Sequence, residues 1–119
     1  MALDVLRAAQ REGSLPVLSA HIATLAGNAA EAPELPAALA RAVALTEAAL
    51  NDPALARQAA SALYHLLTAS AMLWEARQLN MPARAELARL VLRHRVLPRD
   101  PLAPADTPSP ELLAMALAA

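Results

Sequence analysis

Arginine is the residue type in this sequence whose spacing most directly suggests chemistry. Six of the ten arginines lie between residues 77 and 99, where the single acidic residue is Glu86. This stretch carries a charge of +5, whereas residues 1–76 and 100–119 each carry −3. Because a guanidinium group can bind a phosphate through two parallel hydrogen bonds, the pattern predicts one cationic element that contacts phosphate groups.

If this stretch is helical, with successive residues 100° apart, four of its arginines flank an apolar arc from both sides. These four are predicted to contact phosphates: Arg84 and Arg95 on one side, Arg89 and Arg93 on the other. Two others in the stretch are further candidates: Arg77 and Arg99. Such binding weakens as salt rises, because each contact releases counterions. The alternative is a solvated helix face on which Glu86 pairs with arginines three or four residues away.

The histidines do not predict a metal site. His21, His65 and His94 fall on different expected helices, and none has a His, Asp or Glu three or four residues away. A metal would need ligands assembled entirely by tertiary contacts. His94 lies within an apolar arc, which predicts a hydrogen-bonded residue of the core or of an interface.

Trp74 and Glu75 are the nearest approach to a catalytic pair, since a carboxyl beside a large aromatic can act as a general base. Glu75, however, falls opposite the apolar arc of its helix, which predicts a solvated carboxylate. Trp74 is interpreted as the largest residue of the core. With only two glycines and no cysteine, a Gly-rich phosphate loop, thiol catalysis and disulfides are excluded. We therefore assign no catalytic residue.

The composition predicts an all-α fold. Alanine and leucine, both strong helix formers, supply 33 and 23 of the 119 residues, whereas aromatics make up 2%. The expected helices span residues 2–11, about 15–26, about 37–50, 53 to about 79, 82 to about 97 and 111–118. Ser14 is expected to cap the second helix and Asp52 the fourth, with Pro53 in the first helical position.

Two helices show the clearest apolar arcs, and short connections between helices favour an up-and-down antiparallel bundle. The arc of the fourth helix contains Leu63, Leu66, Leu67, Ser70, Leu73, Trp74 and Arg77. The arc of the fifth contains Leu87, Leu90, Val91, His94 and Leu97. The bundle is expected to occupy residues 1–97 and to contain about five helices.

Residues 98–119 are predicted to form a proline-rich tail, because half of the ten prolines fall between positions 98 and 110. The tail ends in a short helix with three leucines that need a partner surface: Leu112, Leu113 and Leu117. No segment is long and apolar enough to cross a membrane. With Asp4 and Arg7 near the start, residues 1–12 do not read as a signal peptide. We therefore expect no membrane partner and a soluble, cytoplasmic protein.

Three segments, taken in order, resemble one family. They are ALDVLRA (2–8), ALYHLLTASAMLWEA (62–76) and ARLVLRHRVLPRDPL (88–102). Together they are similar to the C-terminal helical region of acyl-CoA dehydrogenases, in the branch that includes the bacterial DNA-alkylation-response flavoprotein. Residues 28–60 share only helical character with it.

The resemblance implies an oxidoreductase family that uses FAD, but not catalysis by this chain. In that family a Trp-Glu-Gly motif, whose Glu is the candidate base, comes just before the segment that residues 2–8 resemble. The flavin- and acyl-CoA-binding parts also precede it. The expectation is therefore a domain without catalytic residues or a cofactor of its own, whose missing partner is the flavin-binding region of the parent chain.

For this region the resemblance implies homo-oligomer assembly and, in the DNA-alkylation-response branch, contact with duplex DNA. The expected DNA contacts are non-specific and made by the basic stretch. The alternative is a free-standing helical bundle that forms homo-oligomers or docks a partner without any flavin connection. An enzyme in its own right would require a cofactor held by the bundle alone.

Overall fold

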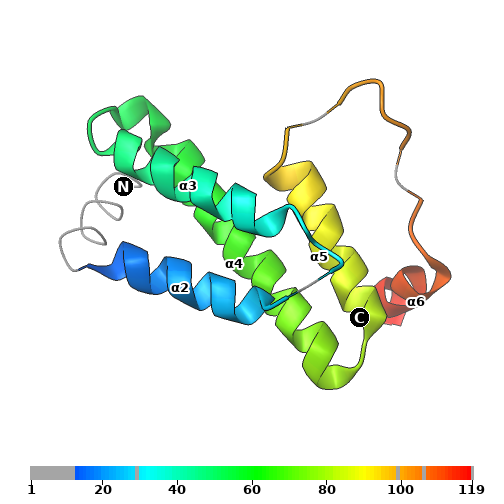
Figure 1. The fold of residues 1–119 in the computed structure, drawn as a ribbon. Helices are drawn as coiled ribbons and strands as arrows, with labels where there is room; N and C mark the ends of the chain where they lie inside the picture. Colours follow the sequence, from blue (N-terminus) through cyan, green and yellow to red (C-terminus); the bar gives the residue numbers. More distant parts are fainter. Residues whose placement is uncertain (1–12, 29, 99, 106, 119) are drawn as a thin grey trace.

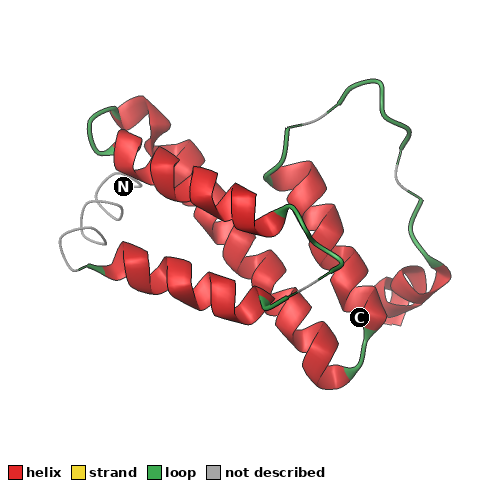
Figure 2. Cartoon of the chain, in the orientation of Figure 1, coloured by secondary structure: helices red, strands yellow, loops and turns green. Residues whose placement is uncertain are grey.

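The all-α prediction is confirmed. The computed structural model describes residues 13–28, 30–98, 100–105 and 107–118, and these residues form helices and loops without a β-strand (Figure 2). The elements are α2 (Ser14–Ala26), α3 (Leu35–Ala49), the 3-10 turn η1 (Pro53–Leu55), α4 (Ala56–Leu79), α5 (Pro82–Arg95) and α6 (Pro110–Ala118). The helix predicted over 2–11 lies outside the described residues.

The long helix α4 is the centre of the bundle. It packs against α2, α3 and α5, and α5 runs back along it after a tight turn at Asn80 (Figure 1). The helices α2 and α3 lie side by side on the other side of α4 and run in opposite directions. The arrangement is an up-and-down bundle, with α6 attached at its edge.

Of the two residues predicted to cap the second and fourth helices, Asp52 does so and Ser14 does not. The carboxylate of Asp52 accepts a hydrogen bond from the Ala54 amide at 3.2 Å, and Pro53 opens the turn that leads into α4, as predicted. Ser14, however, does not cap α2. Gly13, in the left-handed conformation with φ 69°, occupies the N-cap position, so Ser14 becomes the first helical residue.

The core contains many small side chains. Alanines from α2, α3, α4 and α5 are buried with leucines and Ile22, and three alanines of α4 and α5 are fully buried: Ala59, Ala69 and Ala88. Two hydroxyl groups are also buried, and each donates to the carbonyl four residues earlier: Thr46 to Ala42 at 2.8 Å and Ser70 to Leu66 at 2.7 Å. The small side chains of the buried alanines allow the backbones of neighbouring helices to pack closely.

The predicted buried face of α4 is largely confirmed, with corrections at Trp74 and at Arg77, which is exposed. Leu63, Leu66, Ser70 and Leu73 are buried as expected. Trp74, predicted to be the largest core residue, is instead 44% exposed. Its position is at the edge of the buried arc, and an indole needs more room than closely packed alanine-rich helices leave.

The predicted buried face of α5 is only partly correct: Val91 and Leu97 pack against the core as half-buried residues, but Leu87 and Leu90 are not among the residues of the core. The residues of α5 that are buried in the main core are Ala85, Ala88 and Leu92. Leu87 and Leu90 lie on nearly the opposite side of the helix and are half-buried, and His94 is exposed rather than a core residue. The prediction followed the larger side chains, whereas the helix presents its small alanines to α4 because they allow closer packing.

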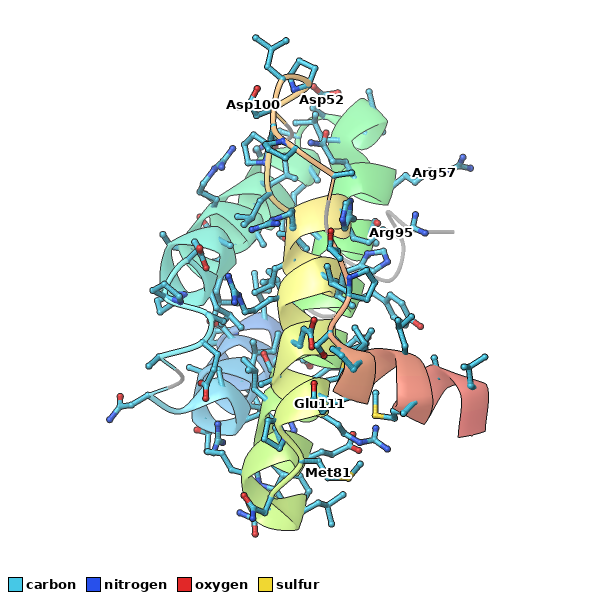
Figure 3. The ribbon with its side chains drawn as sticks, turned by 90° about the vertical axis from the view of Figure 1, so that its right-hand side faces the viewer. Asp52, Arg57, Met81, Arg95, Asp100 and Glu111 are labelled. Carbon is cyan, nitrogen blue, oxygen red and sulfur yellow. The ribbon has the colours of Figure 1, made fainter. Side chains whose placement is uncertain are left out.

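The proline-rich tail returns the chain to α5. Figure 3 shows α6 crossing α5 between Met81 at one end and Arg95 at the other. The helix α6 begins with a predicted signal, Ser109 before Pro110, and the Ser109 hydroxyl accepts a hydrogen bond from the Leu112 amide at 3.1 Å. Leu112 is buried, whereas Leu113 and Leu117 are exposed.

Candidate functional site

Arg84 is engaged within the bundle. Its guanidinium lies 3.0 Å from the carboxylate of Glu75 on α4, and both side chains are about one-third exposed. Glu75, predicted to be a solvated carboxylate opposite the core, is instead half-buried and paired. The ion pair joins α4 to α5 near their connecting turn, so Arg84 stabilises the hairpin of these two helices in addition to any contact with a phosphate.

Arg77, a further phosphate candidate, caps a helix. It lies in the last turn of α4, and its guanidinium donates to the carbonyl oxygens of Ala26 at 2.7 Å and Leu25 at 2.5 Å. These carbonyls belong to the C-terminal end of α2, where the helix dipole favours a cation. Gly27 follows with φ 59°, and a β-carbon there would lie 3.3 Å from the guanidinium carbon.

Arg89, Arg93 and Arg95 are exposed along α5 toward its C-terminal end, and Arg99 lies outside the described residues. Arg93 and Arg95 stand in the last turn of the helix, where cations are stabilised by the helix dipole. All four arginines predicted to contact phosphates therefore lie on α5, but their surroundings differ. Arg84 forms an ion pair with α4 and is half-buried, whereas the other three are exposed.

Glu86, the acidic residue among the arginines, holds the tail. Its carboxylate accepts a hydrogen bond from the Ser109 amide at 2.8 Å and another from the Ser109 hydroxyl. These two bonds hold the pKa of Glu86 below its usual value, and the charge of Arg89 contributes in the same direction. The sequence predicted ion pairs between Glu86 and nearby arginines, and it contained no signal that Ser109, on a distant segment, would bind the carboxylate.

Protonation of Glu86 is expected to loosen α6. Because the pKa is lowered in the folded state, the contact is fully stabilising above the ordinary value of 4.5 and is lost as pH falls through the lowered value. We expect the NMR signal of the Ser109 amide to titrate in that acidic range. In Glu86→Gln the signal should be shifted already at neutral pH and should lose its titration. Glu111→Gln, a change at an exposed carboxyl in the first turn of α6, is the control and should leave the titration intact.

The three histidines lie on three different helices. His65 lies on α4, where Nδ1 contacts the Ser61 carbonyl oxygen at 2.8 Å and the ring packs edge-on against Tyr64. His21 and His94 lie on α2 and α5. Within the described part of the chain, no three His, Cys, Asp or Glu residues are placed to hold a metal ion. None of the described helices combines the length and apolar character needed to cross a lipid bilayer.

No protein-family model, curated protein or solved structure matches this chain. The fold and the contacts above define a small all-α helical bundle. Several of its polar contacts join helix to helix or tail to bundle.

Proposed function

We propose that this chain is a helical assembly domain that associates with a second copy of itself. The observation that carries the proposal is the position of the aromatic residues. The sequence contains one Trp, one Tyr and no Phe, and both lie on α4 at the surface, Tyr64 66% exposed and Trp74 44% exposed. Aromatic side chains are enriched at protein interfaces and carry much of the binding energy there.

The two aromatic residues belong to one side of α4. Ten residues separate them, which places them about 80° apart around the helix, with the half-buried Leu67 between them. A second apolar surface is offered by α6, where Leu113 and Leu117 are four residues apart and exposed. In α-helices such pairs lie on the same face. Both surfaces are suited to packing against another apolar surface.

The resemblance to the C-terminal region of acyl-CoA dehydrogenases supports the same proposal, because that region serves tetramer assembly in the family. If this chain is the C-terminal region of such a flavoprotein, FAD would be bound by other parts of that protein, and this chain would supply packing contacts. The alternative setting is a free-standing bundle that self-associates. The coding sequence before Met1 distinguishes the two: a continuous frame with a Trp-Glu-Gly motif supports the flavoprotein, and a stop codon supports the free-standing protein.

Self-association is tested by sedimentation velocity over a range of concentrations. We expect a concentration-dependent dimer or higher oligomer, and a loss of affinity of at least about tenfold in Tyr64→Ser/Trp74→Ser, because interface aromatics are frequent hot spots. Leu113→Ser/Leu117→Ser tests the surface on α6. Leu102→Ser is the matched control, since Leu102 is 91% exposed in the tail. A monomer at every concentration would contradict the proposal.

A second candidate function, non-specific contact with duplex DNA, is favoured by three exposed arginines on one helix, Arg89, Arg93 and Arg95. The family branch named above supplies the expected partner. We expect Arg89→Ala/Arg93→Ala to weaken binding and to reduce the slope of log affinity against log salt by about two units, one for each lost phosphate contact. Arg57→Ala, at an exposed arginine on α4, is the control. A flat salt response would reject DNA contact.

A further inference from the structure

A hollow lies where α3, α4 and the end of α5 meet. Its volume is about 560 Å³, within the range of about 300–1,000 Å³ usual for small-molecule sites. Most of its wall is aliphatic, formed by Ala38, Ala42, Leu45, Ala62, Val96 and Leu97. No aromatic side chain lines it, so it lacks the stacking surface that a nucleotide base would use.

Two arginines from different helices share the wall of this hollow. Arg41 comes from α3 and Arg95 from the last turn of α5, where Figure 3 labels it. The remaining polar lining consists of Gln58 and Ser61, and no carboxylate lines the hollow. Both arginines are exposed, and within the described part of the chain neither is paired with an acidic residue.

These charges favour an anion. The C-terminal end of α5 contributes a partial charge of about −0.5, which two guanidinium groups outweigh. Other arginines of this chain have partners within the bundle: Arg84 pairs with Glu75, and Arg77 donates to the end of α2. Arg41 and Arg95 differ because each is exposed and lines a hollow that also has aliphatic walls. The combination matches a ligand with an acidic head and an alkyl body.

We propose that this hollow binds a small amphipathic anion. A single carboxylate or phosphate headgroup lies between the guanidinium groups of Arg41 and Arg95, and an unbranched alkyl chain packs against the aliphatic wall. The site is separate from the aromatic surface of α4, since neither Tyr64 nor Trp74 lines it. Ligand binding in this hollow therefore does not depend on self-association of the chain.

The test is titration calorimetry with octanoate and with octyl phosphate, both kept below their micelle-forming concentrations. We expect saturable binding of at least one probe with one site per chain. Arg41→Gln and Arg95→Gln should each weaken it about tenfold, as expected for loss of a charge-assisted hydrogen bond. Arg57→Gln is the matched control, because Arg57 is equally an exposed arginine but extends away from the helices (Figure 3) and should change affinity less than about twofold.

A second variant tests the hollow itself without disturbing the core. Ala44 lines the hollow but is exposed, so Ala44→Trp should fill the space and abolish binding while the helical circular dichroism is unchanged. Tighter binding of octyl phosphate assigns a phosphate headgroup, and tighter binding of octanoate assigns a carboxylate.

Five results would overturn the proposal, and four of them concern binding by the variants and the organic probes. These four are the absence of saturable binding for both probes, retained binding in Ala44→Trp, equal weakening in Arg57→Gln, and equally tight binding of octan-1-ol. Inorganic phosphate binding as tightly as octyl phosphate would also reject the amphipathic ligand, because the aliphatic wall would then contribute nothing.

Discussion

Replacing Arg77 by alanine is expected to lower the free energy of unfolding by about 2 kcal/mol. The guanidinium donates to two carbonyl oxygens at the end of α2, and a hydrogen bond to a charged group contributes about 1.5–3 kcal/mol in proteins. We take a value near the lower end because the side chain is partly exposed to water. Chemical denaturation followed by circular dichroism measures the change.

Replacing the neighbouring Gly27 by alanine is also expected to lower the free energy of unfolding. Its backbone has φ 59° and ψ −146°, a conformation that costs a residue with a β-carbon about 1–3 kcal/mol, and the new carbon would also press on the guanidinium of Arg77. Because both residues serve one contact, the double variant should lose less than the sum of the single variants. Gln78→Ala, at an exposed residue in the same turn of α4, is the control. Equal effects of Arg77→Ala and Gln78→Ala would contradict the capping role.

Replacing Leu92 by alanine is expected to destabilise the bundle by about 3 kcal/mol, because removal of a fully buried leucine loses its transfer free energy and leaves a cavity. Leu92 is only 1% exposed in the core. Leu90→Ala should cost less than about 1.5 kcal/mol, since Leu90 is half-buried and outside that core. Thermal or chemical unfolding of both variants measures the difference.

The two leucine variants form a matched pair. They share a helix, lose the same atoms and change helix propensity equally, so the difference in unfolding free energy reports burial alone. The outcome distinguishes the face of α5 observed in the structure from the face predicted by side-chain size. A larger loss in Leu90→Ala than in Leu92→Ala would show that the leucine-rich side is the stabilising one.

Local signals in the sequence predicted the helices well. Alanine and leucine content indicated the all-α class, and Asp52 with Pro53 marked the start of the α4 region correctly. Most of the buried face of α4 followed from its 3.6-residue period. These features depend on residues within one or two turns of each other, which is why a single sequence reveals them.

Side-chain size misled the predictions where helices approach closely. Trp74 was predicted as a core residue and His94 as a residue of the core or of an interface, and both are exposed in the single chain. The buried residues of α4 and α5 include Ala69, Ala85 and Ala88. A hydrophobic pattern weighs such alanines lightly, although small residues are what permit close packing.

The sequence by itself determined the helical class, the approximate helix limits and the concentration of positive charge between residues 77 and 99. Only the tertiary structure decided what each charged residue does. It brought Arg77 to the end of α2, Arg84 to Glu75, and Glu86 to Ser109. It also placed Arg41 beside the end of α5. Charge is a property of the residue, but its partner is set by the packing of segments distant in sequence, which local periodicity does not encode.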